Sequence, residues 1–302
     1  MELRKILARV DAVVIPKDAT ITQRTQIEDG APYGVWNIET GDAQYILKEA
    51  KGNEVDIYQS ILASFPEGVP ALYQVIPWEE KNYLLMEYVQ GEDLCRCNRA
   101  KLTRALDALI GLQQKTWENQ DFDHLGLSFE KSVLQRQNRG KYLNDSLLEA
   151  AYAQFMRLYE AVPKALCHDD LLPFNVIASD EKAVLIDWEV AGMLPYPTSF
   201  ARLIAYGEEK DDALFYMTQA DRDFAVAYYY QHLLKEKGIS YREWLATLEY
   251  FLFYEYCEWV FVGNKYAATD GEYYQKYLPI AKQQAKKLLE MSEGEKLCWA
   301  SL

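Results

Sequence analysis

The chain has 302 residues, half of them hydrophobic, and a formal net charge of −14 at pH 7. Its hydrophobic content excludes an intrinsically disordered protein, and its length suffices for one large domain or for two lobes that share a core. The acidic surface argues against nucleic acids and anionic membranes as partners and favours cationic ones, although the same charge is typical of an ordinary cytoplasmic protein.

Cysteine usage and hydropathy indicate the cytoplasm. The five scattered cysteines are an odd number, which favours reduced thiols, and Cys95 and Cys97 are too close together for an ordinary metal site. Residues 1–14 lack the features of a signal peptide and predict a short amphipathic helix. The most apolar later stretch contains Glu255 and Glu258 and is too short to cross a bilayer comfortably. We therefore expect a cytoplasmic protein without a membrane segment; the sequence does not indicate its oligomeric state.

Residues 1–90 predict a small lobe built mainly from strands. Apolar runs are separated by Gly30, Gly34 and a turn at residues 40–42, which favours an antiparallel meander. The predicted strands cover residues 20–28, 35–40, 43–50, 71–78 and 83–89. Residues 53–65 have apolar side chains at helical spacing and predict one helix inserted between these strands.

Residues 91–302 predict a larger lobe that is mostly helical. Apolar residues recur at helical spacing in residues 102–117, 146–162, 220–237, 241–262 and 272–291. Only residues 165–189 break this pattern, with short apolar strands around loops and a hairpin turn at residues 179–182. The predicted fold class is α+β and bilobal, with a small antiparallel sheet in the first lobe and mainly helices in the second. The cleft between the lobes is the expected site.

The segment ALCHDDLLPFNVIASDEKAVLIDWE, residues 165–189, holds the densest group of reactive side chains. Asn175 follows Asp170 by five residues on one loop, and Asp187 ends the apolar run that completes the hairpin. Oxygen atoms of such side chains suit a phosphate-bound Mg²⁺, and the remaining carboxylate can orient an attacking hydroxyl. The adjacent pair Asp169 and Asp170 offers two candidates for that second role.

The segments HDDLLPFN and LIDWE resemble the loop H-x-D-x-x-x-x-N and the I-D-W or I-D-F strand end of aminoglycoside phosphotransferases and choline kinases, relatives of the protein kinases. The resemblance extends over residues 20–260 and is close over residues 165–190. It implies a protein-kinase-like fold in which Asp170 is the catalytic residue and Asn175 and Asp187 bind Mg²⁺. It also implies that His168 braces the loop by hydrogen bonding. Asp169 is then a solvated or loop-capping residue, or an electrostatic contact for a cation.

The same resemblance implies that Lys48 contacts the phosphates of the nucleotide. This residue ends an apolar strand, where the lysine of a kinase reaches the α- and β-phosphates. Its partner should be a glutamate of the following helix, and Glu54 is the main candidate, with Glu49 as the weaker one. The alternatives are a surface lysine at a strand end and an exposed helix charge.

Two further segments complete the predicted nucleotide site. Gly30 and Gly34 lie where relatives have a phosphate loop, but their spacing departs from G-x-G-x-x-G, so fewer backbone donors can contact phosphate. The segment LLMEYVQGEDL resembles the strand that leads into the hinge of these enzymes. Met86 would border the adenine, and the backbone of Glu87 to Val89 would hydrogen-bond the base. An ordinary core strand is the alternative.

The acceptor is assigned to the helical lobe. Glu255, Glu258 and Trp259 belong to an aromatic and acidic run that could enclose an amine through charge and cation–π contacts. Glu189, directly after the second motif, is a further candidate. Packing in the core is the alternative for any one of the aromatic side chains.

One departure from the family concerns the segment AGMLPYPTSFARLI. Relatives have an aspartate before the helix that follows the second motif, and this chain has Thr198 and Ser199 there. Because that aspartate anchors local loop structure, its absence puts the rigidity of the loop in doubt. The chain also lacks the long activation segment and the A-P-E sequence of protein kinases, which argues against a protein substrate.

Together these features predict an enzyme: an ATP- and Mg²⁺-dependent kinase that transfers the γ-phosphate to a hydroxyl of a small, cationic acceptor, either aminoglycoside-like or choline-like. GTP is not excluded as the donor. The alternative is a catalytically silent, kinase-like nucleotide-binding module that acts through protein partners. The retention of Lys48, Asp170, Asn175 and Asp187 argues against it. A zinc hydrolase is a third possibility, which three scattered histidines argue against.

Overall fold

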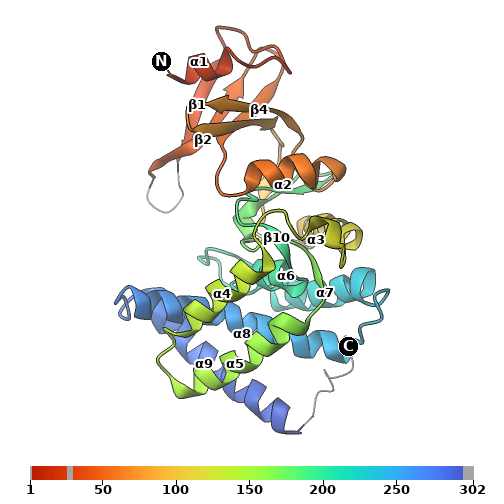
Figure 1. Ribbon diagram of the computed structural model, residues 1–302, viewed down its shortest axis with the longest axis vertical. Helices are drawn as coiled ribbons and strands as arrows, with labels where there is room; N and C mark the ends of the chain where they lie inside the picture. The colour runs from red at the N-terminus through yellow and green to blue at the C-terminus, as the bar shows by residue number, and fades with distance from the viewer. Residues whose placement is uncertain (1, 26–29, 295–302) are drawn as a thin grey trace.

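The computed structural model describes residues 2–25 and 30–294 and shows two lobes stacked along the long axis of the molecule (Figure 1). The predicted bilobal α+β fold is confirmed. The first lobe consists of α1 (Glu2–Leu7), β1 (Thr20–Thr25), β2 (Pro32–Glu39), β3 (Gln44–Glu49), α2 (Glu54–Ser60), η1 (Leu62–Ser64), β4 (Leu72–Trp78) and β5 (Lys81–Glu87). The predicted end of the first strand, residues 26–28, lies outside the described residues.

The five strands of the first lobe form one antiparallel sheet in the order β1-β2-β3-β5-β4. One face of this sheet forms a small core of its own, in which Leu47 is fully buried. Because successive side chains of a strand point to opposite faces, Lys48 leaves the sheet on the other face. On that face Leu84, the register partner of Lys48 on β5, shares a core with Ile57 and Tyr58 of α2. Lys48 therefore points to the side on which α2 lies, between the sheet and the second lobe (Figure 1).

The second lobe carries most of the helices. Its elements are β6 (Glu92–Asp93), α3 (Arg99–Thr116), η2 (Gln120–Phe122), α4 (Phe129–Gly140), α5 (Ser146–Ala161), β7 (Lys164–Cys167), η3 (Pro173–Asn175), β8 (Val176–Ala178), β9 (Ala183–Leu185), β10 (Gly192–Pro195), α6 (Pro197–Ile204), α7 (Gln219–Tyr229), η4 (Tyr230–Leu234), α8 (Tyr241–Lys265) and α9 (Glu272–Gly294). The five helices predicted from apolar spacing correspond to α3, α5, α7 with η4, α8 and α9. The longest, α8, begins at a capping box made by Ser240 and Glu243.

Short strands position the predicted catalytic segment. β7 pairs with β10, and β8 and β9 form the predicted hairpin, closed by a hydrogen bond from Ser179 N to Lys182 O of 2.8 Å. The loop with the adjacent aspartates connects β7 to β8, and Asp187 lies two residues beyond the end of β9. Ile186 N donates to Asn175 O at 3.0 Å, which joins the two motif segments at one end of the hairpin.

Two helices of the second lobe were not predicted from apolar spacing. α4 turns only Ser132 and Arg136 fully inward, so its buried face is polar and gives no apolar stripe. α6 has only eight residues and begins at Pro197, and its buried residues cover more than one face, including Thr198 and Ser199. Both helices lie beside the catalytic segment, as described below.

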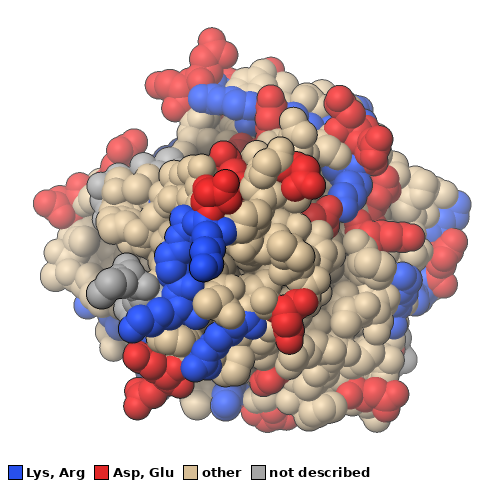
Figure 2. Space-filling view, turned by 90° about the horizontal axis from the view of Figure 1, so that it is seen from above, with Lys and Arg blue, Asp and Glu red and all other residues tan. Residues whose placement is uncertain are grey.

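The net charge is not evenly distributed over the surface. Seen from above, on the end formed by the first lobe, Lys and Arg side chains gather in one patch beside the centre while Asp and Glu side chains lie mostly around the rim (Figure 2). None of the helices in the described part of the chain combines the length and the apolar composition needed to cross a membrane.

Candidate active site

Lys48 connects the two lobes through two ion pairs. Its Nζ lies 2.6 Å from Glu54 Oε1 on α2 and 2.6 Å from Asp187 Oδ1 after β9. Burial acts to lower the pKa of Lys48, but the charges of Glu54 and Asp187 outweigh it, so this pKa is raised and the ammonium group keeps its charge. The Glu54 side chain is fully buried, so α2 is held against the sheet by an ion pair that solvent does not screen.

Asn175 is hydrogen-bonded to Ile186, the residue before Asp187, where the loop joins the hairpin. Asn175 Nδ2 donates to Asp170 O at 2.8 Å, so the amide oxygen is the atom that remains for a metal. Burial acts to raise the pKa of Asp187, but the charge of Lys48 lowers it below its ordinary range, which keeps the carboxylate ionised. One carboxylate and one amide oxygen are hard donors that fit Mg²⁺ with the remaining positions left to phosphate and water.

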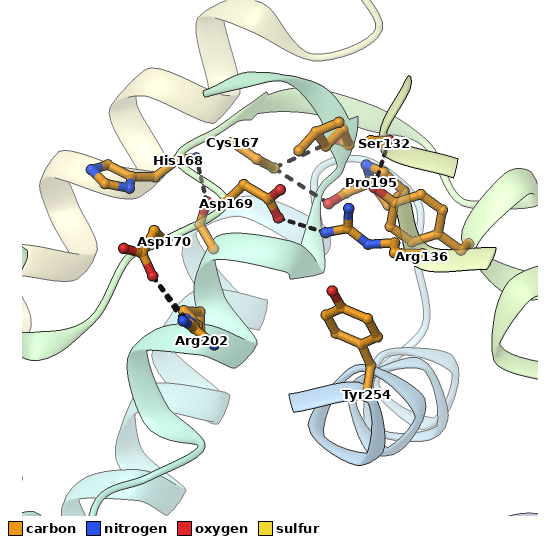
Figure 3. Close-up of polar contacts among 12 residues, drawn as sticks. Ser132, Arg136, Cys167, His168, Asp169, Asp170, Pro195, Arg202 and Tyr254 are labelled. Atoms are coloured by element: carbon orange, nitrogen blue, oxygen red, sulfur yellow. Dashed lines mark hydrogen bonds and ion pairs between the residues drawn. The ribbon is translucent and has the colours of Figure 1, made fainter. Parts of the chain in front are cut away.

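The adjacent aspartates point to opposite sides of the loop and contact different arginines (Figure 3). Asp169 Oδ1 lies 2.5 Å from Arg136 Nη2 of α4, in a pair whose side chains are only 12% and 1% exposed. Asp170 Oδ1 lies 2.8 Å from Arg202 Nη2 of α6, and the Asp170 side chain is 41% exposed. Asp169 has φ 59°, a left-handed backbone conformation that turns its side chain away from that of Asp170. Only Asp170 is open to a reactant.

His168 is a brace within the fold. Its ring is fully buried against Trp188, with ring centroids 4.7 Å apart, and Nε2 lies 2.6 Å from Ile186 O. Since a carbonyl oxygen only accepts, Nε2 carries the proton and donates. Burial lowers the pKa of His168, which keeps the ring neutral. The hydrogen bond ties the start of the loop to the residue before Asp187.

Ser199 anchors the loop where relatives use an aspartate. The backbone N–H of His168 donates to Ser199 Oγ at 2.8 Å, and Ser199 is fully buried on α6. A serine hydroxyl accepts this bond without adding a third acidic side chain beside Asp169 and Asp170. The rigidity that the sequence left in doubt is therefore supplied by a hydroxyl group.

The residues predicted to contact the nucleotide lie on the sheet of the first lobe or in the segments next to its strands. Gly30 has φ 70° and is exposed beside the undescribed residues 26–29, and Gly34 lies within β2, where a Cβ atom would come within 2.8 Å of Glu49 Cβ. Met86 is buried on β5. Val89 is half-buried after β5.

Glu87 makes a contact that the sequence did not indicate. Its carboxylate lies 3.1 Å from Lys182 Nζ in the turn between β8 and β9. A second bond runs from Ala71 N to Glu87 Oε2 at 3.1 Å. These contacts fix the segment that leads from the sheet into the second lobe.

The residues predicted to contact the acceptor have partners on neighbouring elements. Glu255 pairs with Arg202 at 2.8 Å and Glu258 pairs with Arg139 of α4 at 2.9 Å. Trp259 stacks on Tyr273 of α9 with centroids 4.3 Å apart.

Glu189 contributes a backbone contact. Its carbonyl oxygen accepts a bond from Asn53 N at 3.3 Å, and Gly52 passes so close that a Cβ atom there would lie 2.4 Å from the same oxygen. This contact fixes the start of α2 to the segment that follows Asp187.

Sequence reasoning missed the arginines that surround the loop. The two unpredicted helices supply three arginines: Arg136, Arg139 and Arg202. These arginines form ion pairs with four carboxylates: Asp169, Asp170, Glu255 and Glu258. The sequence did indicate that cationic partners were needed, because acidic side chains that become buried require counter-ions. It does not say which arginines supply them.

Comparisons with known proteins agree with this geometry. Residues 25–233 match the model of the phosphotransferase enzyme family. An aminoglycoside-3'-phosphotransferase of type VIII is 21% identical with a TM-score of 0.56, covering 84% of this chain and 97% of its own. The choline kinase of Cryptosporidium parvum is 14% identical with a TM-score of 0.62, covering 92% of each chain.

A third similar structure is an amicoumacin kinase in complex with AMP-PNP, Ca²⁺ and Ami. It is 17% identical with a TM-score of 0.59 and covers 95% of this chain and 94% of its own. No curated protein matches the chain in a sequence search. The family match spans more than half of the chain and includes Lys48, the aspartate loop and Asp187. The chain therefore belongs to the phosphotransferase enzyme family.

Proposed function

We propose that this enzyme transfers the γ-phosphate of ATP to a hydroxyl group of a small, cationic acceptor, with Mg²⁺ bound at Asn175 and Asp187. GTP is an alternative donor. Residues 1–90 would bind the nucleotide, and residues 91–302 would supply the catalytic loop, the metal ligands and the acceptor site. The observation that carries the proposal is the pairing of Lys48 with both Glu54 and Asp187, each at 2.6 Å.

That pairing supports a phosphate site between the lobes. With Glu54 buried behind it, Lys48 can turn from Asp187 to the α- and β-phosphates while keeping one counter-ion. Gly30, Gly34 and Met86 would then line the nucleotide, with the backbone of Glu87 and Val89 holding the base. A bound Mg²⁺ would supply positive charge at the transferred phosphoryl group. The Asp187 carboxylate, released from Lys48, would be free to hold it.

Asp170 is the residue placed to handle the acceptor hydroxyl. It is the more exposed of the two aspartates and has a neighbour, Asn175, that fixes its backbone through a 2.8 Å hydrogen bond. Its carboxylate would align the hydroxyl and accept its proton as the phosphoryl group transfers. His168 would hold the loop in place and take no part in the proton transfer.

The charge balance favours a cationic acceptor. The four carboxylates around the loop exceed the three arginines by one, and the chain as a whole is strongly acidic. Glu189 and Trp259 are the further candidates for contact with the acceptor. An ammonium group would be attracted into such a site and steered to it over a distance of about 10 Å at 0.1 M salt.

The test combines an acceptor screen with a metal-binding measurement. ADP release should be followed with ATP and Mg²⁺ across hydroxylated amines and matched neutral alcohols, and we expect the amines to be faster. ATP binding by Asp187→Asn should lose the Mg²⁺ enhancement of the parent, whereas both proteins should bind equally in EDTA. Equal Mg²⁺ enhancement in both proteins would exclude Asp187 as a ligand, and faster release with neutral alcohols would exclude the cationic acceptor.

A further inference from the structure

Arg202 links the catalytic loop to helix α8. Its Nη2 and Nε donate to Asp170 Oδ1 at 2.8 and 3.2 Å, and its Nη1 donates to Glu255 Oε2 at 2.8 Å. Figure 3 shows Arg202 rising from α6 toward Asp170, on the side of the loop away from Asp169. The guanidinium group of Arg202 therefore bridges the candidate catalytic carboxylate and a buried glutamate, Glu255, that lies 53 residues after Arg202 in the chain.

The bridge leaves one oxygen of Asp170 open. Both Arg202 contacts are to Oδ1, and Oδ2 has no hydrogen bond or ion pair with any other part of the chain that the structure describes. Two nitrogens of the planar guanidinium group converge on this one oxygen, so Arg202 holds Oδ1 in place and leaves Oδ2 directed away from itself. The open oxygen is the one that can reach an acceptor hydroxyl.

The far end of the bridge is rigid. The Glu255 side chain is 4% exposed, so its charge requires a counter-ion, and Arg202 is its ion-pair partner. Tyr206 OH lies 2.8 Å from Glu255 O and 3.1 Å from Glu255 Oε2, and the two oxygens share its single proton, which holds Glu255 from the other side. Arg202 in turn lies over the Tyr206 ring, 5.6 Å from its centroid.

We propose that Arg202 is a positioning residue that fixes the Asp170 carboxylate for proton acceptance, with Glu255 as its counter-ion. This inference rests on the proposed function, in which Asp170 aligns the acceptor hydroxyl. It changes the expected role of Glu255: loss of its charge acts on turnover through Arg202 and Asp170, instead of on acceptor affinity. Arg202 touches no reacting atom.

The first test is kinetic. Arg202→Gln should lower kcat on the order of 10- to 100-fold, the scale of a misplaced catalytic group, while the KM values for ATP and the acceptor change less than about three-fold. Glu255→Gln should lower kcat in the same way. Arg202→Lys keeps the charge but reaches one carboxylate at a time, so it should restore part of the lost kcat. A rise in acceptor KM with unchanged kcat would make these residues acceptor contacts and overturn the proposal.

A double variant separates positioning from folding. Arg202→Met leaves Glu255 buried without its partner, so a loss of activity there could reflect misfolding alone. Adding Glu255→Gln removes the unpaired charge and should restore thermal stability without restoring kcat. Recovery of kcat together with stability would overturn the proposal. The matched control, Lys287→Met with Glu249→Gln, removes a 2.8 Å ion pair that joins α9 to the same helix α8 and should leave kcat within about two-fold.

Two measurements distinguish failure of the inference from failure of the proposed function. In an Asp170→Asn background, Arg202→Gln should cause no further loss of kcat, because the two residues act as one unit. If Asp170→Asn is itself fully active, the proposed function fails. A crystal structure of the Arg202→Met, Glu255→Gln variant needs no acceptor. If its Asp170 carboxylate keeps the orientation of the parent, the positioning role is overturned whatever the kinetics.

Discussion

The two adjacent aspartates of the loop have the same chemistry and opposite environments. Asp169 faces Arg136, and both side chains are almost excluded from water; Asp170 faces Arg202, and both remain partly exposed. The guanidinium of Arg136 also lies between two rings, 4.5 Å from the Tyr159 centroid and 4.9 Å from that of Tyr254. Burial therefore separates two carboxylates that are neighbours in the chain.

The difference assigns a structural role to one pair and a reactive role to the other. Burial acts to lower the pKa of Arg136, but the negative charge of Asp169 raises it well above its ordinary value, so the guanidinium group stays charged inside the protein. An enclosed pair of this kind cannot exchange partners without leaving a charge unpaired. Asp170 can exchange its partner, because its second oxygen already faces solvent or a reactant.

The largest effect is expected at Asp170. Asp170→Asn removes the proton acceptor and should lower kcat by about 10² or more, the usual contribution of a general base. Its ion pair is partly exposed, so the free energy of unfolding should change by less than about 1 kcal/mol. Steady-state ADP release, ATP binding and urea unfolding measure the three quantities. An Asp170→Asn enzyme with the turnover of the parent would reverse the roles of the two aspartates.

Asp169→Asn should give the opposite result. Asparagine tolerates the left-handed backbone at this position, so the change removes charge without adding strain. The buried Arg136 loses its counter-ion, and the free energy of unfolding should fall by about 3 kcal/mol. For the folded fraction, kcat should fall much less than in Asp170→Asn. If urea unfolding shows Asp169→Asn to be as stable as the parent, the enclosed pair has no structural importance.

Ser199→Ala should give a smaller effect. The alanine leaves the His168 N–H buried without an acceptor, which should lower the free energy of unfolding by about 1–3 kcal/mol. Because this bond anchors the loop of Asp170, kcat should fall as well. The matched control is Ser132→Ala on α4, which removes a buried hydroxyl that lies 3.0 Å from Tyr159 OH. It should lower stability without lowering kcat; an equal loss of kcat in both variants would remove the anchoring role of Ser199.

The sequence predicted what is local and missed what is distant. The motifs that contain Lys48, Asp170, Asn175 and Asp187 can be recognised from their spacing in the sequence. Apolar periodicity predicted five helices of the second lobe. The arginines pair with residues at least 32 positions away, so no local pattern encodes their contacts. The helices that carry them were missed because one buries a charged side chain and the other is eight residues long.

The smallest effect expected is a pH dependence of stability that originates at His168. Burial lowers the pKa of this ring below the ordinary 6.5, and its Nε2–H already donates to Ile186 O. The unfolded chain therefore binds a proton near pH 6.5 that the folded protein does not bind. The contribution is fully present above pH 6.5 and is lost as the pH falls below it, by at most about 1.4 kcal/mol for each pH unit.

The groups that face the ring do not reverse this sign. Asp170 and Asp187 act to raise the pKa of His168 and Lys48 acts to lower it, but burial is the largest influence. His168→Gln keeps an N–H donor for Ile186 O and has no group that titrates in this range. Urea unfolding of both proteins at pH 7.5, 6.5 and 5.5 should show the parent losing stability relative to the variant as the pH falls, and subtraction removes the contributions of the other histidines. A parent that gains stability relative to His168→Gln on acidification would mean that the ring is protonated in the folded state. It would then be a second charged group beside Asp170, and the contrast between one reactive and one enclosed aspartate would have to include it.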